Sequence, residues 1–116
     1  MELNPQQTAA AAYSGDARNI LVTAGAGCGK TRTLIARAVH LARSGADVSR
    51  LLLMTFTNRA AREMKIRLKR EIGPLSGKIQ AGTFHSFCLK AIATLPKSFD
   101  ATGLNVIDGD DQKALM

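Results

Sequence analysis

The stretch "NILVTAGAGCGKTRTLIARAVHLARSG", residues 19–45, decides the fold of this 116-residue chain. It opens with an apolar run over 19–24, which is typical of a strand buried on both faces of a parallel sheet. A glycine-rich turn follows, and Gly45 should end the helix that comes next. The apolar face of that helix is expected to consist of Leu34, Ile35, Ala38, Leu41 and Ala42. The order strand, turn, helix predicts the first unit of an α/β sheet.

The alternation of strands and helices continues along the chain. The expected elements are strands over 50–56 and 78–84, and helices over 58–73 and 85–95. Strands that alternate with helices pair in parallel, and parallel sheets bind ligands at the carboxyl ends of their strands. We therefore expect the chemistry at the three junctions that follow Thr23, Met54 and Ala81.

Helix faces and outer elements complete this prediction. In the helix over 58–73, which Gly73 and Pro74 should close, the buried face is expected to consist of Ala60, Ala61, Met64 and Leu68. A short helix precedes the first strand: Asn4 caps it, Pro5 occupies its first position and Gly15 ends it. Further along, 104–108 is a candidate fourth strand.

The composition adds a charge argument. The apolar fraction of 46% is enough to build a core, whereas a net charge of +7 and a pI near 10.0 are unusual. They indicate a polyanionic partner such as nucleic acid, or a basic surface that faces another subunit. Cys28 and Cys88 lack metal-binding spacing, so we expect free thiols in the cytoplasm. No apolar run approaches the roughly 20 residues that span a bilayer, and we expect no membrane partner.

The glycine-rich turn has the composition of a phosphate-binding loop. Gly29-Lys30-Thr31 match the end of the pattern G-x-x-x-x-G-K-[ST], although Ala24 replaces its first glycine. The N–H groups of such a turn point at phosphates, Lys30 would bridge the β- and γ-phosphates, and the Thr31 hydroxyl would hold Mg²⁺. A glycine-rich turn with an incidental lysine is the plainer alternative. The position between an apolar strand and an amphipathic helix favours the phosphate loop.

Four segments together resemble a known family. They are "LNPQQ" (3–7), "AGAGCGKT" (24–31), "TFTNRAAREMKIRL" (55–68) and "GTFHSFC" (82–88). In order and spacing they resemble the Q motif, the Walker A loop and motifs Ia and Ib of superfamily 1 DNA helicases of the UvrD/Rep/PcrA type. Cys28 stands where serine is usual, and Arg59 where lysine is usual.

The resemblance implies a RecA-like P-loop NTPase fold, a parallel sheet flanked by helices, with ATP and Mg²⁺ as cofactors. It implies that Lys30 and Thr31 are catalytic and that Thr31 is the metal ligand. The implied nucleotide-binding residues are Gln7, Ala24, Gly25, Ala26, Gly27, Cys28, Gly29, Lys30, Thr31 and Arg32. Of these, Gln7 would read the N6/N7 edge of adenine.

The same resemblance implies single-stranded DNA and the remaining helicase domains as partners. The implied DNA-contacting residues are Phe56, Thr57, Asn58, Arg59, Thr83 and His85. Plainer alternatives stay open: Phe56 could be a core aromatic, and Phe84 is more readily explained as one. His85 could cap its helix. The basic run from Arg59 to Arg70 fits a solvated helix face better than a DNA track.

By this resemblance, residues 1–116 are the N-terminal portion of helicase domain 1A, ending before the acidic DExx motif. Asp108 is then a helix cap or turn former rather than a metal ligand. We expect the chain to bind nucleotide weakly without hydrolysing it, and its parent to move 3′ to 5′ on single-stranded DNA. The alternatives are a small phosphotransferase resembling nucleotide kinases, and a non-catalytic nucleic-acid-binding module.

Overall fold

The computed structural model describes residues 2–25 and 29–94. The elements are α1 (Pro5–Ala11), α2 (Lys30–Arg43), η1 (Val48–Arg50), β1 (Leu52–Thr55), α3 (Asn58–Ile72), η2 (Gly73–Lys78), β2 (Gln80–Thr83) and α4 (Phe84–Ala93). Two units divide the chain, one over Met1–Phe84 and one over His85–Met116. The first unit holds everything up to the end of β2.

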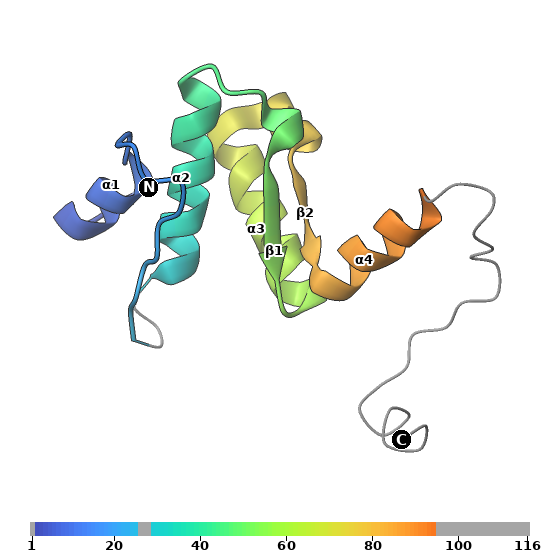
Figure 1. Cartoon of the computed structure of the whole chain (residues 1–116). Coiled ribbons are helices and arrows are strands. Elements are labelled where there is room, and N and C mark those ends of the chain that lie inside the picture. The colour runs from blue at the N-terminus through green and yellow to red at the C-terminus, as the bar shows by residue number, and fades with distance from the viewer. Residues whose placement is uncertain (1, 26–28, 95–116) are drawn as a thin grey trace. The chain divides into compact units, whose positions relative to one another are not determined.

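A parallel pair of strands forms the sheet. β1 and β2 run in the same direction, in a register that pairs Leu52 with Gln80 and Thr55 with Thr83. The helix between them, α3, packs against both strands, and α2 packs against α3. Figure 1 shows α3 behind the two strands. The predicted α/β class, with a parallel sheet flanked by helices, is confirmed.

The core of the first unit lies between α2, α3 and the sheet. Its buried members are Ile35, Ala38, Val39, Val48, Leu53, Met64, Leu68 and Ile79. The predicted face of α3 is confirmed at Ala61, Met64 and Leu68, which are buried, whereas Ala60 is half-buried. The predicted face of α2 is confirmed at Ile35 and Ala38, whereas Leu34 is 42% exposed.

Both long helices end at the predicted glycines. Gly45, one residue beyond the C-cap of α2, has φ +88°, and Gly73, at the C-cap of α3, has φ +60°. Glycine adopts these backbone angles without the steric cost of a Cβ. The stop signals in the sequence were therefore sufficient to place these two helix ends.

Asp47 is the N-cap of η1, the short 3-10 helix between α2 and β1. Its carboxylate accepts hydrogen bonds from the hydroxyl (2.6 Å) and the backbone N–H (3.1 Å) of Ser49, at the start of η1. These two bonds hold the pKa of Asp47 below its ordinary value of 3.8, because they favour the ionised form. They stabilise the fold fully above that ordinary pKa, and the contribution is lost as the pH falls through the lowered one.

The first helix, α1, starts as predicted but ends earlier. The Asn4 side chain accepts from the N–H of Gln7, the Gln7 side chain accepts from the N–H of Asn4, and Pro5 is the first helical residue. The helix stops at Ala11 rather than at Gly15. The Arg37 guanidinium from α2 donates to the carbonyls of Ala11 and Tyr13, which stabilises the chain leaving α1.

The strand predicted over 19–24 is wrong for this chain. The segment has no regular structure, and Leu21 is 87% exposed. In the described part of the chain the sheet consists of β1 and β2 alone. A strand buried on both faces needs a hydrogen-bonded neighbour as well as apolar layers above and below it. The described residues provide no such neighbour, so the apolar run lies beside α2 as an irregular segment.

Helix α4 begins with Phe84, the last residue of the first unit, and its other residues belong to the second; it confirms the predicted third helix up to Ala93. The candidate strand at 104–108, Asp108 and the expected stop at Pro96 lie outside the described residues. Within the described ranges, no helix combines the length and the apolar character needed to cross a bilayer.

Candidate functional site

The site begins where α2 begins. Gly29 is the N-cap of α2, with φ +80° and ψ +28°, and its carbonyl accepts from both the N–H and the hydroxyl of Thr33, each at 3.0 Å. A Cβ added at Gly29 would lie 2.4 Å from Nε2 of Gln7. The backbone angle and this close contact both require glycine.

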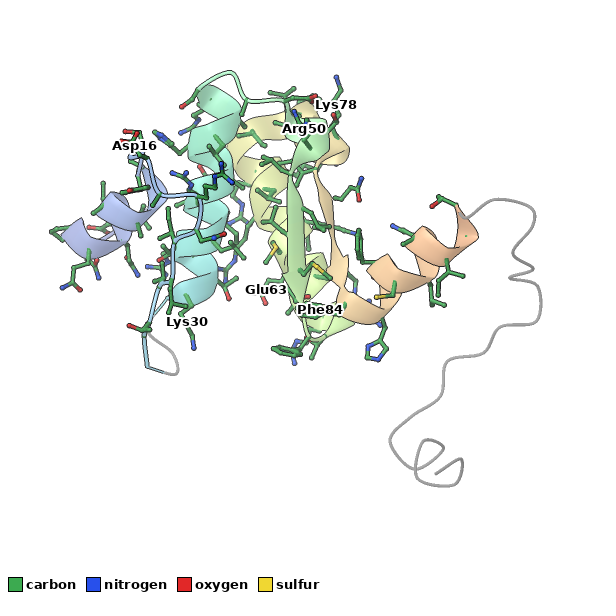
Figure 2. The ribbon with its side chains drawn as sticks, in the orientation of Figure 1. Asp16, Lys30, Arg50, Glu63, Lys78 and Phe84 are labelled. Atoms are coloured by element: carbon green, nitrogen blue, oxygen red, sulfur yellow. The ribbon has the colours of Figure 1, made fainter. Side chains whose placement is uncertain are left out.

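A cavity opens in front of this helix end. Its volume is about 370 Å³, and it is lined by Gln7 and Asn4 from α1, by Lys30, and by the loop segment 23–25. Lys30 is the first residue of α2 and is exposed; Figure 2 shows it at the loop end of that helix. The two predicted nucleotide-binding segments, 3–7 and 24–31, therefore both line one hollow. The predicted residues Ala26, Gly27 and Cys28 lie outside the described residues.

Gln7 occupies a position with two demands on its side chain. Its Oε1 accepts from the N–H of Asn4 at 3.0 Å, which closes the capping box of α1, and its Nε2 lies next to Gly29. A carboxamide that reads adenine bidentately uses both atoms. Because the amide oxygen has two lone pairs, Oε1 can accept from adenine while it keeps the bond to Asn4.

The start of α2 suits a polyphosphate with its cation. The Thr31 hydroxyl is exposed in the first turn of the helix, and the helix N-terminus and the Lys30 ammonium both favour anions. Among the described residues, no three His, Cys, Asp or Glu side chains gather as a metal site.

Arg32 lies away from this cavity. Its Nη1 donates to the carbonyl of Glu2 at 3.4 Å. With Glu2, Arg67, Arg70 and Glu71 it lines a separate hollow of about 490 Å³. Its predicted place beside the nucleotide stays a prediction.

Arg37 is a functional candidate that the sequence analysis missed. It lines a hollow of about 470 Å³ together with Lys30 and Arg18. The signal was available, because Lys30, Thr33 and Arg37 are spaced i, i+3, i+7 and so share one helix face. Its hydrogen bonds to the end of α1 connect the helix that carries Lys30 to the helix that carries Gln7.

Two aromatic rings stand at the carboxyl edge of the sheet. Phe56 follows β1 and Phe84 follows β2; their centroids are 5.5 Å apart and their planes are inclined by 43°. Phe56 is 89% exposed and Phe84 is 46% exposed. The core alternative is therefore wrong for both rings, including Phe84, for which it was the favoured explanation. Figure 2 labels Phe84 at this edge.

The other predicted DNA-contacting residues differ in exposure and in hydrogen bonding. Thr57 caps α3, since its hydroxyl accepts from the N–H of Ala60 at 3.1 Å. Asn58 and Arg59 are exposed in the first turn of α3, whereas Thr83 is buried. His85 is exposed in α4, within the second unit.

The basic run on α3 is a solvated helix face, which is the explanation that the sequence favours over a DNA track. Its exposed members are Arg59, Arg62, Lys65, Lys69 and Arg70. Arg67 is half-buried and pairs with Glu63 at 2.9 Å, one helical turn earlier. Only Arg59 and Arg62 lie in the half of α3 that begins at the carboxyl edge.

Sequence comparison identifies the family. Residues 3–116 match the family model of the UvrD/REP helicase N-terminal domain. The chain belongs to this family. It therefore has the RecA-like P-loop fold, and its two parallel strands with α2 and α3 are part of that fold.

Individual relatives agree with this assignment. The chain is 36% identical over 117 residues to the ATP-dependent DNA helicase UvrD1 of Mycobacterium tuberculosis, which covers 98% of this chain and 15% of that protein. It is 39% identical over 120 residues to the ATP-dependent DNA helicase PcrA of Bacillus subtilis, with the same two coverages. It is 41% identical over 103 residues to the ATP-dependent DNA helicase PcrA of Staphylococcus aureus, a match that covers 84% of this chain and 14% of that protein. The chain thus spans about 15% of the length of these relatives.

Proposed function

We propose that this chain is the ATP-binding part of a DNA helicase motor that acts in the cytoplasm. In the whole protein, ATP hydrolysis drives 3′ to 5′ movement along single-stranded DNA. Relatives over nearly the whole chain are named ATP-dependent DNA helicases, which supports the class. The observation that carries the proposal is the meeting of Gln7, the loop start at Thr23–Gly25 and Lys30 at one cavity.

On the nucleotide side, each residue has a separable task. Lys30 holds the β- and γ-phosphates, the Thr31 hydroxyl holds Mg²⁺, and Gln7 holds the base. Gly29 begins α2 without a side chain of its own, so the first N–H groups of the helix can face the phosphates while Gln7 lies beside Gly29. When bound, ATP would supply the phosphoryl group that passes to water, and Mg²⁺ held by Thr31 would offset the negative charge of the phosphates.

On the nucleic-acid side, the partner is single-stranded DNA at the carboxyl edge of β1 and β2. The exposed Phe56 ring offers a stacking face to a base, and Arg59 offers a charge to the backbone. Asn58 contacts the same strand, and Thr57 donates its hydroxyl while still accepting from α3. The two sites begin separate helices, so nucleotide and DNA do not compete for the same atoms.

The 116-residue chain alone binds ATP but does not hydrolyse it. Hydrolysis needs an acidic group that orients water and an arginine that neutralises the transition state, and such an arginine alone is worth about 10³–10⁵ in rate. The rest of domain 1A supplies the acidic group, and the arginines come partly from a second domain of the motor. The family match favours a helicase motor over a phosphotransferase or a non-catalytic binding module.

Titration with a fluorescent ATP analogue and Mg²⁺ tests the nucleotide site. Lys30→Ala should raise Kd about tenfold or more, because it removes a charge-assisted contact to phosphate. Lys65→Ala, which removes an exposed lysine from α3, serves as the matched control and should leave Kd unchanged. Equal Kd values for the wild type and Lys30→Ala would refute the site. Phosphate release stimulated by single-stranded DNA and lost in Lys30→Ala would refute the claim that the chain alone is inactive.

A further inference from the structure

The two rings at the carboxyl edge are brought together by the strand register. Thr55 and Thr83 are paired across β1 and β2, and each phenylalanine comes one residue later. Side chains at matching positions of neighbouring parallel strands lie on the same face. A register shift of one residue would send the rings to opposite faces. The 5.5 Å separation of Phe56 and Phe84 is therefore a product of the sheet.

The inclination of the rings restricts how they can bind a ligand. At 43° to each other, they cannot both lie flat against two bases that stack on one another. Phe56 is the more exposed ring and presents a whole face, whereas Phe84 is half covered and touches Phe56. One base therefore takes Phe56, and Phe84 acts through it.

We propose that Phe84 is a positioning residue for the single-stranded DNA site: its ring holds the Phe56 ring in place as the platform for one unpaired base. This inference rests on the proposed function. Phe56 stands on the two-residue link between β1 and α3, with little around it to fix its rotamer. Contact with Phe84 restricts that freedom before DNA arrives, so less conformational entropy is lost on binding.

The chemistry around the platform favours a single strand of nucleic acid over other ligands. Arg59 and Arg62 are exposed in the first half of α3, and the first turn of α3 contains no acidic residue. The net charge of the chain is +7. A ligand that combines flat apolar faces with regular negative charge fits these features. Duplex DNA does not, because neighbouring base pairs cover the faces of its bases.

A double-mutant cycle with the complete chain tests the inference. The probe is a dye-labelled 16-nucleotide oligothymidylate, and Kd is measured by fluorescence anisotropy. Phe56→Leu should raise Kd about tenfold, since stacking on an aromatic ring is lost. Phe84→Leu should raise it about three- to fivefold, and the double variant should match Phe56→Leu alone. Phe84→Tyr, which keeps the ring, should bind like the wild type.

Two controls separate this role from a structural one. Leu75→Ala removes a comparably exposed apolar side chain from η2 and should leave Kd unchanged. A strand of the same length without bases should bind wild type and Phe84→Leu equally, because it offers phosphates but nothing to stack.

Each contrary outcome has a distinct meaning. If Phe84→Leu weakens binding equally with and without Phe56, or not at all, Phe84 does not act through Phe56 and the inference fails while the DNA site stands. If Phe84→Tyr binds as weakly as Phe84→Leu, the ring contact is not the cause and the inference also fails. If Phe56→Leu leaves Kd unchanged, the proposed DNA site itself is wrong.

Discussion

Gly29 concentrates two constraints in one residue. Its φ of +80° disfavours any residue with a Cβ, and the space a Cβ would occupy is taken by the Gln7 side chain. Gly45 has a similar φ of +88°, but a Cβ there meets no atom within 4 Å. The two glycines differ mainly in what surrounds them, so a pair of alanine substitutions separates backbone strain from the contact with Gln7.

We predict that Gly45→Ala lowers the free energy of unfolding by about 1–2 kcal/mol, the cost of a left-handed backbone with a Cβ. Gly29→Ala should cost at least as much and should also weaken binding of the ATP analogue, because the new methyl group displaces Gln7. Urea unfolding and the titration described above measure the two quantities. Unchanged nucleotide affinity in Gly29→Ala would show that the Gln7 contact has no part in binding.

At the scale of elements, α1 is positioned by a side chain from another helix. The Arg37 guanidinium donates to the carbonyl of Ala11 at 3.0 Å and to that of Tyr13, at the end of α1 where carbonyls lack helical partners. No basic residue lies in the last turn of α1 itself. A cation supplied by α2 therefore stabilises this helix end.

We predict that Arg37→Ala lowers the free energy of unfolding by about 1–2 kcal/mol, since hydrogen bonds from a charged group are lost at a partly exposed site. Amide hydrogen exchange should quicken in α1 more than in α3, because the anchor is local. Arg62→Ala, an exposed position on α3, is the matched control and should change neither quantity. Equal exchange in α1 of both variants would contradict the anchoring role.

The elements also show what the sequence could and could not predict. Helices α2 and α3 were predictable because their periodic apolar residues and closing glycines are local signals. The segment 19–24 was not, because its apolar run fits a buried strand only when other strands flank it. Likewise, the exposure of Phe84 depends on where β2 ends relative to β1, which is a property of the pair and not of either sequence.

For the whole molecule, the residues that form the apolar core are different from the residues of the candidate site. The core consists of side chains from α2, β1 and α3 together with Val48 and Ile79, whereas Lys30, Phe56 and Arg59 are exposed at the ends of elements. Motifs could therefore predict the candidate site, because exposed residues at strand and helix ends are not needed to pack the core. Two tertiary contacts hold the elements of the candidate site in place: Arg37 bonds to the end of α1, and Phe84 packs on Phe56. Neither contact could be predicted from one segment of the sequence alone.

The same separation predicts unequal costs for two identical substitutions. Leu68 is 1% exposed in the core, whereas Leu21 is 87% exposed in the apolar run over 19–24. Leu68→Ala should lower the free energy of unfolding by about 2–5 kcal/mol, and Leu21→Ala should change it by less than about 0.5 kcal/mol. Urea unfolding followed by circular dichroism measures both, and each variant loses the same atoms, so the difference reports burial alone. A large cost for Leu21→Ala would mean that the run over 19–24 is buried in this chain, as its sequence first indicated, and that the sheet extends beyond β1 and β2.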